Sequence, residues 1–190
     1  MNKAVFLDRD GVIIKDTDLL TDIEQIVISA VVPKALSTLK QAEYKLIIVS
    51  NQAVVARGLI SEDDVRRINS EIERQIIELG GPKFDAMYFC PHHPNATLPE
   101  YRKNCNCRKP RNGMMMQAAE KYNIDLSKSF MIGDRITDIV AGKNAGCKTI
   151  LLETGMHNAK TIVTVDKIDK NIQPDFKCEN LLTAAEWITQ

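Results

Sequence analysis

Two aspartates follow a short apolar run near the start of the sequence. The run 4–7 leads directly into Asp8-Arg9-Asp10-Gly11. Side chains two positions apart in an extended chain point to the same face, so we expect the Asp8 and Asp10 carboxylates to lie side by side. Neighbouring carboxylates repel each other unless they share a proton or bind a divalent cation. The alternative is an acidic turn. An EF-hand calcium loop is excluded, because its ligand positions hold apolar residues here.

Polar residues also follow two later apolar runs. Ser50 comes after the run 46–49, and Asp134 comes after the run 130–132, with Asp138 four residues further on. Taken singly, Ser50 is typical of a turn and Asp134 of a helix cap. The carboxyl ends of parallel strands meet at one edge of a sheet, where an acid, a hydroxyl and a second acid can converge. The runs together predict an active site there, with Asp134 facing a metal and Asp138 supporting a neighbouring side chain.

A cluster of metal-binding residue types lies in the middle of the sequence. Cys90, His92, Cys105 and Cys107 supply three sulfurs and one imidazole, enough for a closed tetrahedral zinc site, and His93 is a competing ligand. The chain has five cysteines, an odd number that favours metal binding in a reducing compartment over a disulfide framework. Four protein ligands leave no open coordination position, so we expect a structural zinc.

The composition limits the partners of the chain. Its 25 lysines and arginines balance its 25 aspartates and glutamates over 190 residues, so no net charge attracts nucleic acid or an anionic membrane. No apolar run approaches the ~20 residues of a membrane helix, and acidic residues arrive too early for a secretion signal. We expect a cytoplasmic protein with one domain over residues 1–190 that acts on a small molecule.

Short apolar runs alternate with longer amphipathic segments, which is the pattern of a parallel sheet with helices on both faces. The expected strands are 4–7, 46–49, 86–89, 130–132 and 149–152, the third of which also fits a helix. Helices are expected from Pro33 through Leu39, after Ser61, from Met114, and over 181–188. Residues 91–112 lack periodicity, so we expect a functional or metal-held loop there.

The motifs, taken in order, resemble those of the haloacid dehalogenase superfamily of phosphatases. Asp8-Arg9-Asp10-Gly11 resembles its first motif, Ser50 its second, Lys109 its third, and Gly133-Asp134 with Asp138 its fourth. The resemblance covers the chain to about residue 152 and implies a three-layer, Rossmann-like α/β fold. It implies a nucleophile in Asp8 and a general acid and base in Asp10. Ser50 and Lys109 would hold the phosphate oxygens, and Mg²⁺ would be bound by Asp8, Asp134 and the Asp10 carbonyl.

A narrower set of motifs resembles the heptose bisphosphate phosphatases and their histidinol phosphatase relatives. The set includes Ser50-Asn51-Gln52, Ala56-Arg57-Gly58 and Cys107-Arg108-Lys109-Pro110. The resemblance favours His92 over His93 as the zinc ligand and implies removal of the phosphate remote from the anomeric carbon. Asn51 and Gln52 would then contact substrate, and Arg57 and Arg108 could bind a second phosphate, although both could equally be surface charges.

The chain departs from that pattern in two places and leaves little room for a lid. Val12 replaces a common threonine, and Ala53-Val54-Val55 replaces a more usual Ser-Gly-Ile beside the expected substrate pocket. The spacing between motifs is too short for a large cap domain, so the zinc loop at about 90–108 is expected to act as the lid of a monomer.

Three other functions compete with the heptose bisphosphate assignment. Histidinol phosphatase is the nearest. A DNA 3′-phosphatase uses the same chemistry but should carry a basic stripe, which the balanced charge argues against. A non-catalytic, zinc-stabilised interaction module is disfavoured because the sequence retains the whole catalytic set, namely Asp8, Asp10, Ser50, Lys109 and Asp134.

Overall fold

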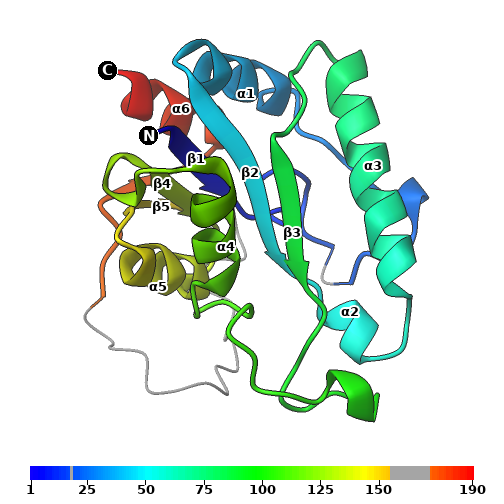
Figure 1. Cartoon of the computed structure of the whole chain (residues 1–190). Coiled ribbons are helices and arrows are strands. Elements are labelled where there is room, and N and C mark those ends of the chain that lie inside the picture. The colour runs from blue at the N-terminus through cyan, green and yellow to red at the C-terminus, as the bar shows by residue number, and fades with distance from the viewer. Residues whose placement is uncertain (18, 155–171) are drawn as a thin grey trace.

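A parallel sheet of six strands forms the centre of the computed structural model, which describes residues 1–17, 19–154 and 172–190 (Figure 1). Its order is β3-β2-β1-β4-β5-β6. The strands are β1 (Lys3–Leu7), β2 (Tyr44–Asn51), β3 (Ala86–Cys90), β4 (Phe130–Gly133), β5 (Lys148–Leu152) and β6 (Phe176–Cys178). β1 lies between β2 and β4, and Val5 is in register with Leu46 on one side and Phe130 on the other.

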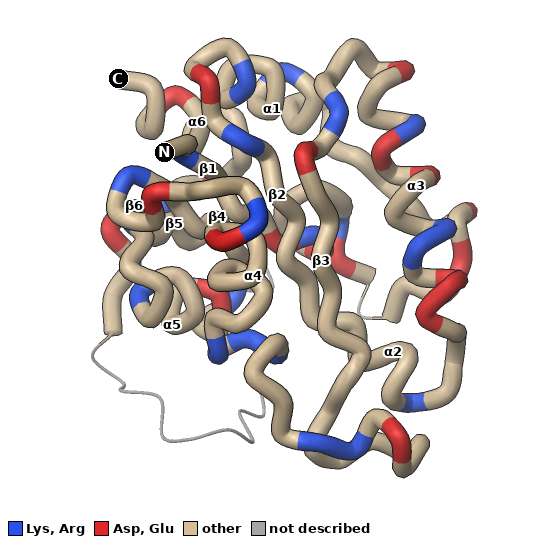
Figure 2. Tube along the Cα trace, viewed as in Figure 1, with Lys and Arg blue, Asp and Glu red and all other residues tan. Residues whose placement is uncertain are grey.

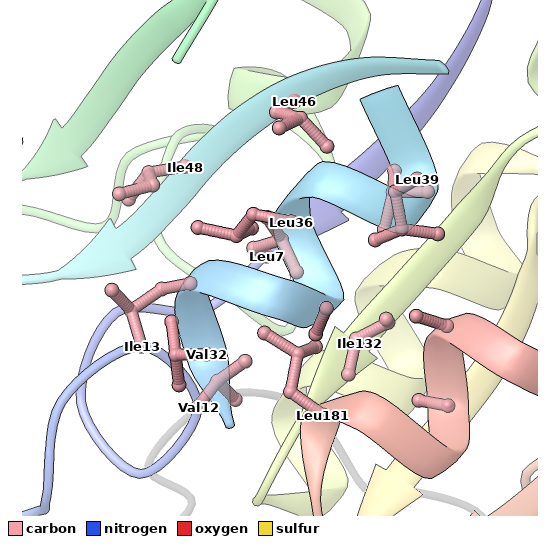
Figure 3. Close-up of a cluster of buried hydrophobic side chains, with 14 of the residues drawn as sticks. Leu7, Val12, Ile13, Val32, Leu36, Leu39, Leu46, Ile48, Ile132 and Leu181 are labelled. Atoms are coloured by element: carbon pink, nitrogen blue, oxygen red, sulfur yellow. The ribbon is translucent and has the colours of Figure 1, made fainter. Parts of the chain in front are cut away.

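Helices cover both faces of this sheet. They are α1 (Val32–Gln41), α2 (Ala53–Ala56), α3 (Glu62–Glu78), α4 (Gly113–Tyr122), α5 (Ile136–Ala145) and α6 (Leu181–Thr189), with 3-10 turns at Ile23–Gln25, Pro99–Tyr101 and Leu126–Lys128. Successive strand residues point to opposite faces. Val5 and Leu7 therefore pack in one core with α1, α3 and α6, part of which is seen in Figure 3, while Ala4 and Phe6 pack in a second core with α4 and α5. The expected three-layer α/β fold is confirmed.

The long helix α3 shows how the sequence sets an element's start and its buried face. The Ser61 hydroxyl accepts a hydrogen bond from the Asp64 backbone N–H at 3.1 Å, and the Asp64 side chain accepts one from the Ser61 N–H at 3.0 Å. This capping box satisfies backbone donors at the helix start. Residues Val65, Ile68 and Ile72 are buried on one face, and acidic and basic residues alternate along the exposed one (Figure 2).

All five predicted strands are present, and the four predicted helices correspond to α1, α3, α4 and α6. α5 is the helix expected after Asp134, with Asp138 in its first turn. Among the described strands and α-helices, α2 and β6 were not predicted. α2 has four residues and β6 has three, which is too short for either to show a periodic pattern. Within residues 91–112, all of which the structure describes, the only helical turn is Pro99–Tyr101. Among the described helices, none combines the length and apolar character needed to cross a membrane.

Candidate active site and metal centre

Asp8 stands at the carboxyl end of the central strand. β1 ends at Leu7, and the Asp8 backbone N–H donates to the carbonyl of Ile132 on β4 at 2.9 Å. Its carboxylate accepts a hydrogen bond from the Arg9 backbone N–H at 2.8 Å. The Asp8 side chain is therefore fixed by the sheet and the first peptide beyond it, and it faces the same edge as Asp134 after β4.

Lys109 lies buried against two carboxylates. Its Nζ lies 2.9 Å from Asp8 Oδ1 and 2.7 Å from Asp138 Oδ1, and the residue is only 3% exposed. Burial opposes the charged ammonium, but the Asp138 and Asp8 carboxylates outweigh it and raise the pKa of Lys109. The ammonium is thus held as a cation between the carboxylates of Asp8 and Asp138.

Three buried carboxylates converge at this edge. Asp8, Asp134 and Asp138 each place an oxygen within 4.8 Å of the others. Burial, followed by the charges of Asp8 and Asp138, raises the pKa of Asp134 to about 8. Neither Asp134 oxygen has a hydrogen-bond partner within the described parts of the chain. Buried oxygens without donors, grouped with other carboxylates, have the chemistry of a site for a hard divalent cation.

Two glycines leave the space that this cluster occupies. A Cβ atom on Gly11, whose φ is +82°, would lie 2.3 Å from Asp134 Oδ2, and one on Gly133 would lie 2.2 Å from the Asp138 Cβ. Asp134 does not cap the following helix, because α5 is preceded by Arg135, whose backbone N–H donates to the Asp138 side chain at 3.0 Å. Asp134 is thereby free to face the cluster.

The Asp10 carboxylate belongs to a second group of polar side chains. β1 ends at Leu7, and the three-carboxylate cluster does not include Asp10. The Asp10 carboxylate accepts from the Arg9 guanidinium at 3.0 Å and from Gln52 Nε2 at 2.8 Å. The expectation that the Asp8 and Asp10 carboxylates lie side by side stays a prediction.

The residues after β2 form hydrogen bonds with other site residues. Asn51 Oδ1 accepts from the Lys109 backbone N–H, and Asn51 Nδ2 donates to the Lys109 carbonyl, both at 3.0 Å. Gln52 Nε2 donates to Ser50 Oγ at 2.7 Å. Because Ser50 accepts that bond, its own hydroxyl hydrogen remains available to a phosphate oxygen. Asn51 fixes the backbone that carries Lys109.

The cysteine and histidine residues form a second cluster beside β3. Sγ of Cys107 lies 3.1 Å from Cys105 Sγ, 3.2 Å from Cys90 Sγ and 3.4 Å from His92 Nδ1. The sulfur separations are far longer than the ~2.05 Å of a disulfide and somewhat shorter than the ~3.8 Å implied by Zn–S bonds of ~2.3 Å. Hydrogen bonds from its neighbours, Cys90 first, lower the pKa of Cys107 to about 5. This cluster could hold one metal ion.

Two arginines, Arg57 and Arg108, lie near His93 of the loop that carries the second cluster. Arg57 is exposed, whereas Arg108 is partly buried and donates to the carbonyl of His92 at 3.0 Å. Burial, followed by the charges of Arg108 and Arg57, lowers the pKa of His93. The charges of Arg57 and Arg108 therefore both act on His93 and disfavour its protonated form.

Sequence reasoning missed two site residues. Arg9 is 1% exposed, and its guanidinium donates to Asp10, Gln52 and Asn69. Arginine is rarely buried, and Asn69 lies sixty positions further along the chain on α3, so no local pattern predicts their contact. The one available signal was the interruption of the apolar face of α3 by an asparagine.

Comparison with known proteins gives a consistent result. A family model described as HAD-hydrolase-like matches residues 106–184. The D-glycero-beta-D-manno-heptose-1,7-bisphosphate 7-phosphatase of Pasteurella multocida is 40% identical over 156 residues, which are 82% of this chain and 84% of the relative. The D-glycero-D-manno-heptose-1,7-bisphosphate 7-phosphatase of Chlorobaculum tepidum is 34% identical over 96% of this chain and 92% of its own length.

A solved structure gives the same picture. The D,D-heptose 1,7-bisphosphate phosphatase of B. bronchiseptica, crystallised with magnesium and phosphate, is 29% identical to this chain. It superposes with a TM-score of 0.79 over 98% of this chain and 97% of its own. The likeness of fold therefore extends over nearly the whole of both chains.

Proposed function

This chain belongs to the heptose-1,7-bisphosphate 7-phosphatase family of HAD-like hydrolases, and on that premise we propose that it hydrolyses the C7 phosphate of D-glycero-D-manno-heptose 1,7-bisphosphate. The match to the Chlorobaculum tepidum relative covers 96% of this chain and 92% of the relative. The substrate assignment rests on the names of these relatives, and the chemistry rests on the residues at the carboxyl edge of the sheet.

Formation of a covalent intermediate is the first step. An Asp8 oxygen attacks phosphorus, the bond from phosphorus to the C7 oxygen breaks, and Asp10 donates a proton to that oxygen. Lys109 lies 2.9 Å from Asp8 and presents its charge to the transferring phosphoryl oxygens, to which the Ser50 hydroxyl also donates. The product of this step is an aspartyl phosphate on Asp8 and the free C7 alcohol.

Hydrolysis of the intermediate is the second step. Asp10, now a carboxylate, takes a proton from water as the water oxygen attacks phosphorus, and inorganic phosphate leaves Asp8. Asp8, Asp134 and the Asp10 carbonyl would hold Mg²⁺, consistent with the unpartnered oxygens of Asp134. When bound, that ion offsets the repulsion between an anionic nucleophile and an anionic phosphate.

The observation that carries the proposal is the buried ion pair between Lys109 and Asp8 within a group of three carboxylates. The test is phosphate release from heptose 1,7-bisphosphate, heptose 1-phosphate and histidinol phosphate with Mg²⁺. We expect turnover of the bisphosphate and its loss in Asp8→Asn. Asp63→Asn, at an exposed carboxylate on α3, is the matched control and should keep the wild-type rate. Full activity in Asp8→Asn would refute the nucleophile.

We propose Zn²⁺ as the ion of the second cluster, held by Cys90, His92, Cys105 and Cys107 with no open position. Arg111 donates to the Cys105 carbonyl at 2.9 Å, which ties the cluster to the turn that carries Lys109. Elemental analysis should find about one zinc per chain, lost when Cys105 and Cys107 become serine.

The control for that experiment is Cys147→Ala, at a buried cysteine outside the cluster, which should retain the metal. A stable wild-type protein without zinc would contradict the assignment. The zinc loop is also the proposed lid, and Arg57 with Arg108 is the proposed contact for the C1 phosphate. Arg57→Ala should therefore raise KM for the bisphosphate more than KM for 4-nitrophenyl phosphate.

A further inference from the structure

Arg9 is a buried guanidinium that the mechanism above does not use. It follows the nucleophile directly and is 1% exposed. Its Nε lies 3.2 Å from Asp10 Oδ1, and its Nη2 lies 3.0 Å from Oδ1 and 3.1 Å from Oδ2 of the same carboxylate. Burial of a charge is costly unless the charge is paired, and this two-pronged contact supplies the pairing. The Arg9 fork therefore fixes the plane and position of the Asp10 carboxylate.

Two uncharged side chains fix the guanidinium in turn. Asn69 Oδ1, on α3, accepts from Arg9 Nη1 at 3.1 Å, and Gln52 Oε1 accepts from Nη2 at 2.8 Å. Gln52 also reaches Asp10 itself, because its Nε2 donates to Oδ2 at 2.8 Å. Gln52 and Asn69 are both buried. These hydrogen bonds thus join three parts of the fold, namely the turn after β1, the end of β2 and the middle of α3.

We propose that Arg9, Gln52 and Asn69 are positioning residues that hold Asp10 for proton transfer. The inference rests on the acid and base role of Asp10 in the proposed function. The Asp10 side chain is 26% exposed, so it presents an open side to the substrate while its other side is bonded to this buried group. We call these three residues the Asp10 bracket. A misplacement of about 1 Å at a reacting group can slow a reaction about a hundredfold, so loss of a bracket contact should lower the rate measurably. The bracket itself gains and loses no proton.

The test compares two leaving groups. Departure of the C7 alkoxide of heptose 1,7-bisphosphate needs a proton from Asp10, whereas 4-nitrophenolate leaves without one. The ratio kcat/KM reports the steps through formation of the aspartyl phosphate for both substrates. Asn69→Leu removes the acceptor for Arg9 Nη1 with little change in volume. We expect kcat/KM to fall about tenfold or more for the bisphosphate and to change less than about twofold for 4-nitrophenyl phosphate.

Matched variants separate positioning from a loss of packing. Asn69→Asp keeps an acceptor for Arg9 and should restore the wild-type ratio. Ile68→Val, at the buried position next to it on α3, should leave the ratio unchanged. Arg9→Lys keeps the charge without the planar fork and should reproduce the pattern of Asn69→Leu, which covers a failure of that variant to fold.

The outcomes distinguish this inference from the proposed function. Asp10→Asn should show the largest preference for 4-nitrophenyl phosphate. Suppose that it does, and that Asn69→Leu and Arg9→Lys lower kcat/KM equally for both substrates or for neither. The positioning role is then overturned and the phosphatase mechanism stands. If Asp10→Asn shows no dependence on the leaving group, the acid role of Asp10 is refuted and the bracket falls with it.

Discussion

Magnesium should bind much more tightly at pH 8 than at pH 6. In the metal-free protein, burial and the charges of Asp8 and Asp138 raise the pKa of Asp134 to about 8. A carboxyl group must lose its proton to bind a metal ion, so protons compete with magnesium below that pH. The competition weakens binding by a factor of about 100 at pH 6 and about 2 at pH 8 for a pKa of about 8. The expected gain in affinity is therefore about 50-fold, or about 2 kcal/mol.

The same shift sets how the stability of the metal-free protein depends on pH. The pKa of Asp134 rises from 3.8 to about 8 on folding, so between these values the folded state holds a proton that the unfolded state has released. Stability of the metal-free protein should accordingly fall as the pH rises through this window. Magnesium should reverse the trend, because it binds the deprotonated folded state.

Calorimetric titration in two buffers with different ionisation enthalpies tests this directly, because the difference in heat counts protons. Binding should release close to one proton at pH 6 and about half a proton at pH 8, where the carboxyl is half ionised. Asp134→Asn is the control and should lose the strong binding at both values. Equal affinity at pH 6 and pH 8, or no proton release at pH 6, would show that Asp134 is ionised before the metal arrives.

Two further substitutions test the packing of the site. Lys109→Met leaves Asp138 without its counter-charge, so the unfolding free energy measured with urea at pH 8 should fall by about 3 kcal/mol or more. The fall should be smaller at pH 5, because carboxyl groups can take up protons there. An equal fall at both pH values would contradict the ion-pair argument. Gly11→Ala would place a Cβ 2.3 Å from Asp134 Oδ2, so magnesium binding and the unfolding free energy should both fall. Gly80→Ala has a similar φ of +83° but open space around its Cβ, so it measures the backbone cost alone, and an effect as large as that of Gly11→Ala would exclude a steric cause.

The site was predictable where a local pattern and the sheet geometry agree. Asp8, Ser50 and Asp134 each come at or after the end of an apolar run, and parallel pairing brings those ends to one edge whatever the intervening helices do. The cysteine and histidine cluster was predictable because its residue types have few other uses in a loop. The family resemblance then identified Lys109, whose burial no periodicity reveals.

Other features depend on long-range packing and were not predictable. The contact of Asp10 with Gln52 joins the turn after β1 to the end of β2, 42 positions further along the chain. The contact of Arg9 with Asn69 depends on the rotation of α3 over the sheet. β6 pairs in parallel with β5 through a register that begins at Ile150 and Phe176, and three residues are too few for alternation to be seen.

The central place of β1 has a consequence for the newly made chain. β1 is translated first, and β2 pairs with it from Tyr44 onward, but its other neighbour begins at Phe130, opposite Val5. At roughly 5 to 20 residues per second, that second edge stays open for about 6 to 25 s of synthesis. During this time an apolar strand has one free edge on the ribosome, and Asp8 lacks the partners that follow β4. Until β4 has been made, the nascent chain therefore lacks part of its active site and is most open to mispairing, and a chaperone would protect it best during this period.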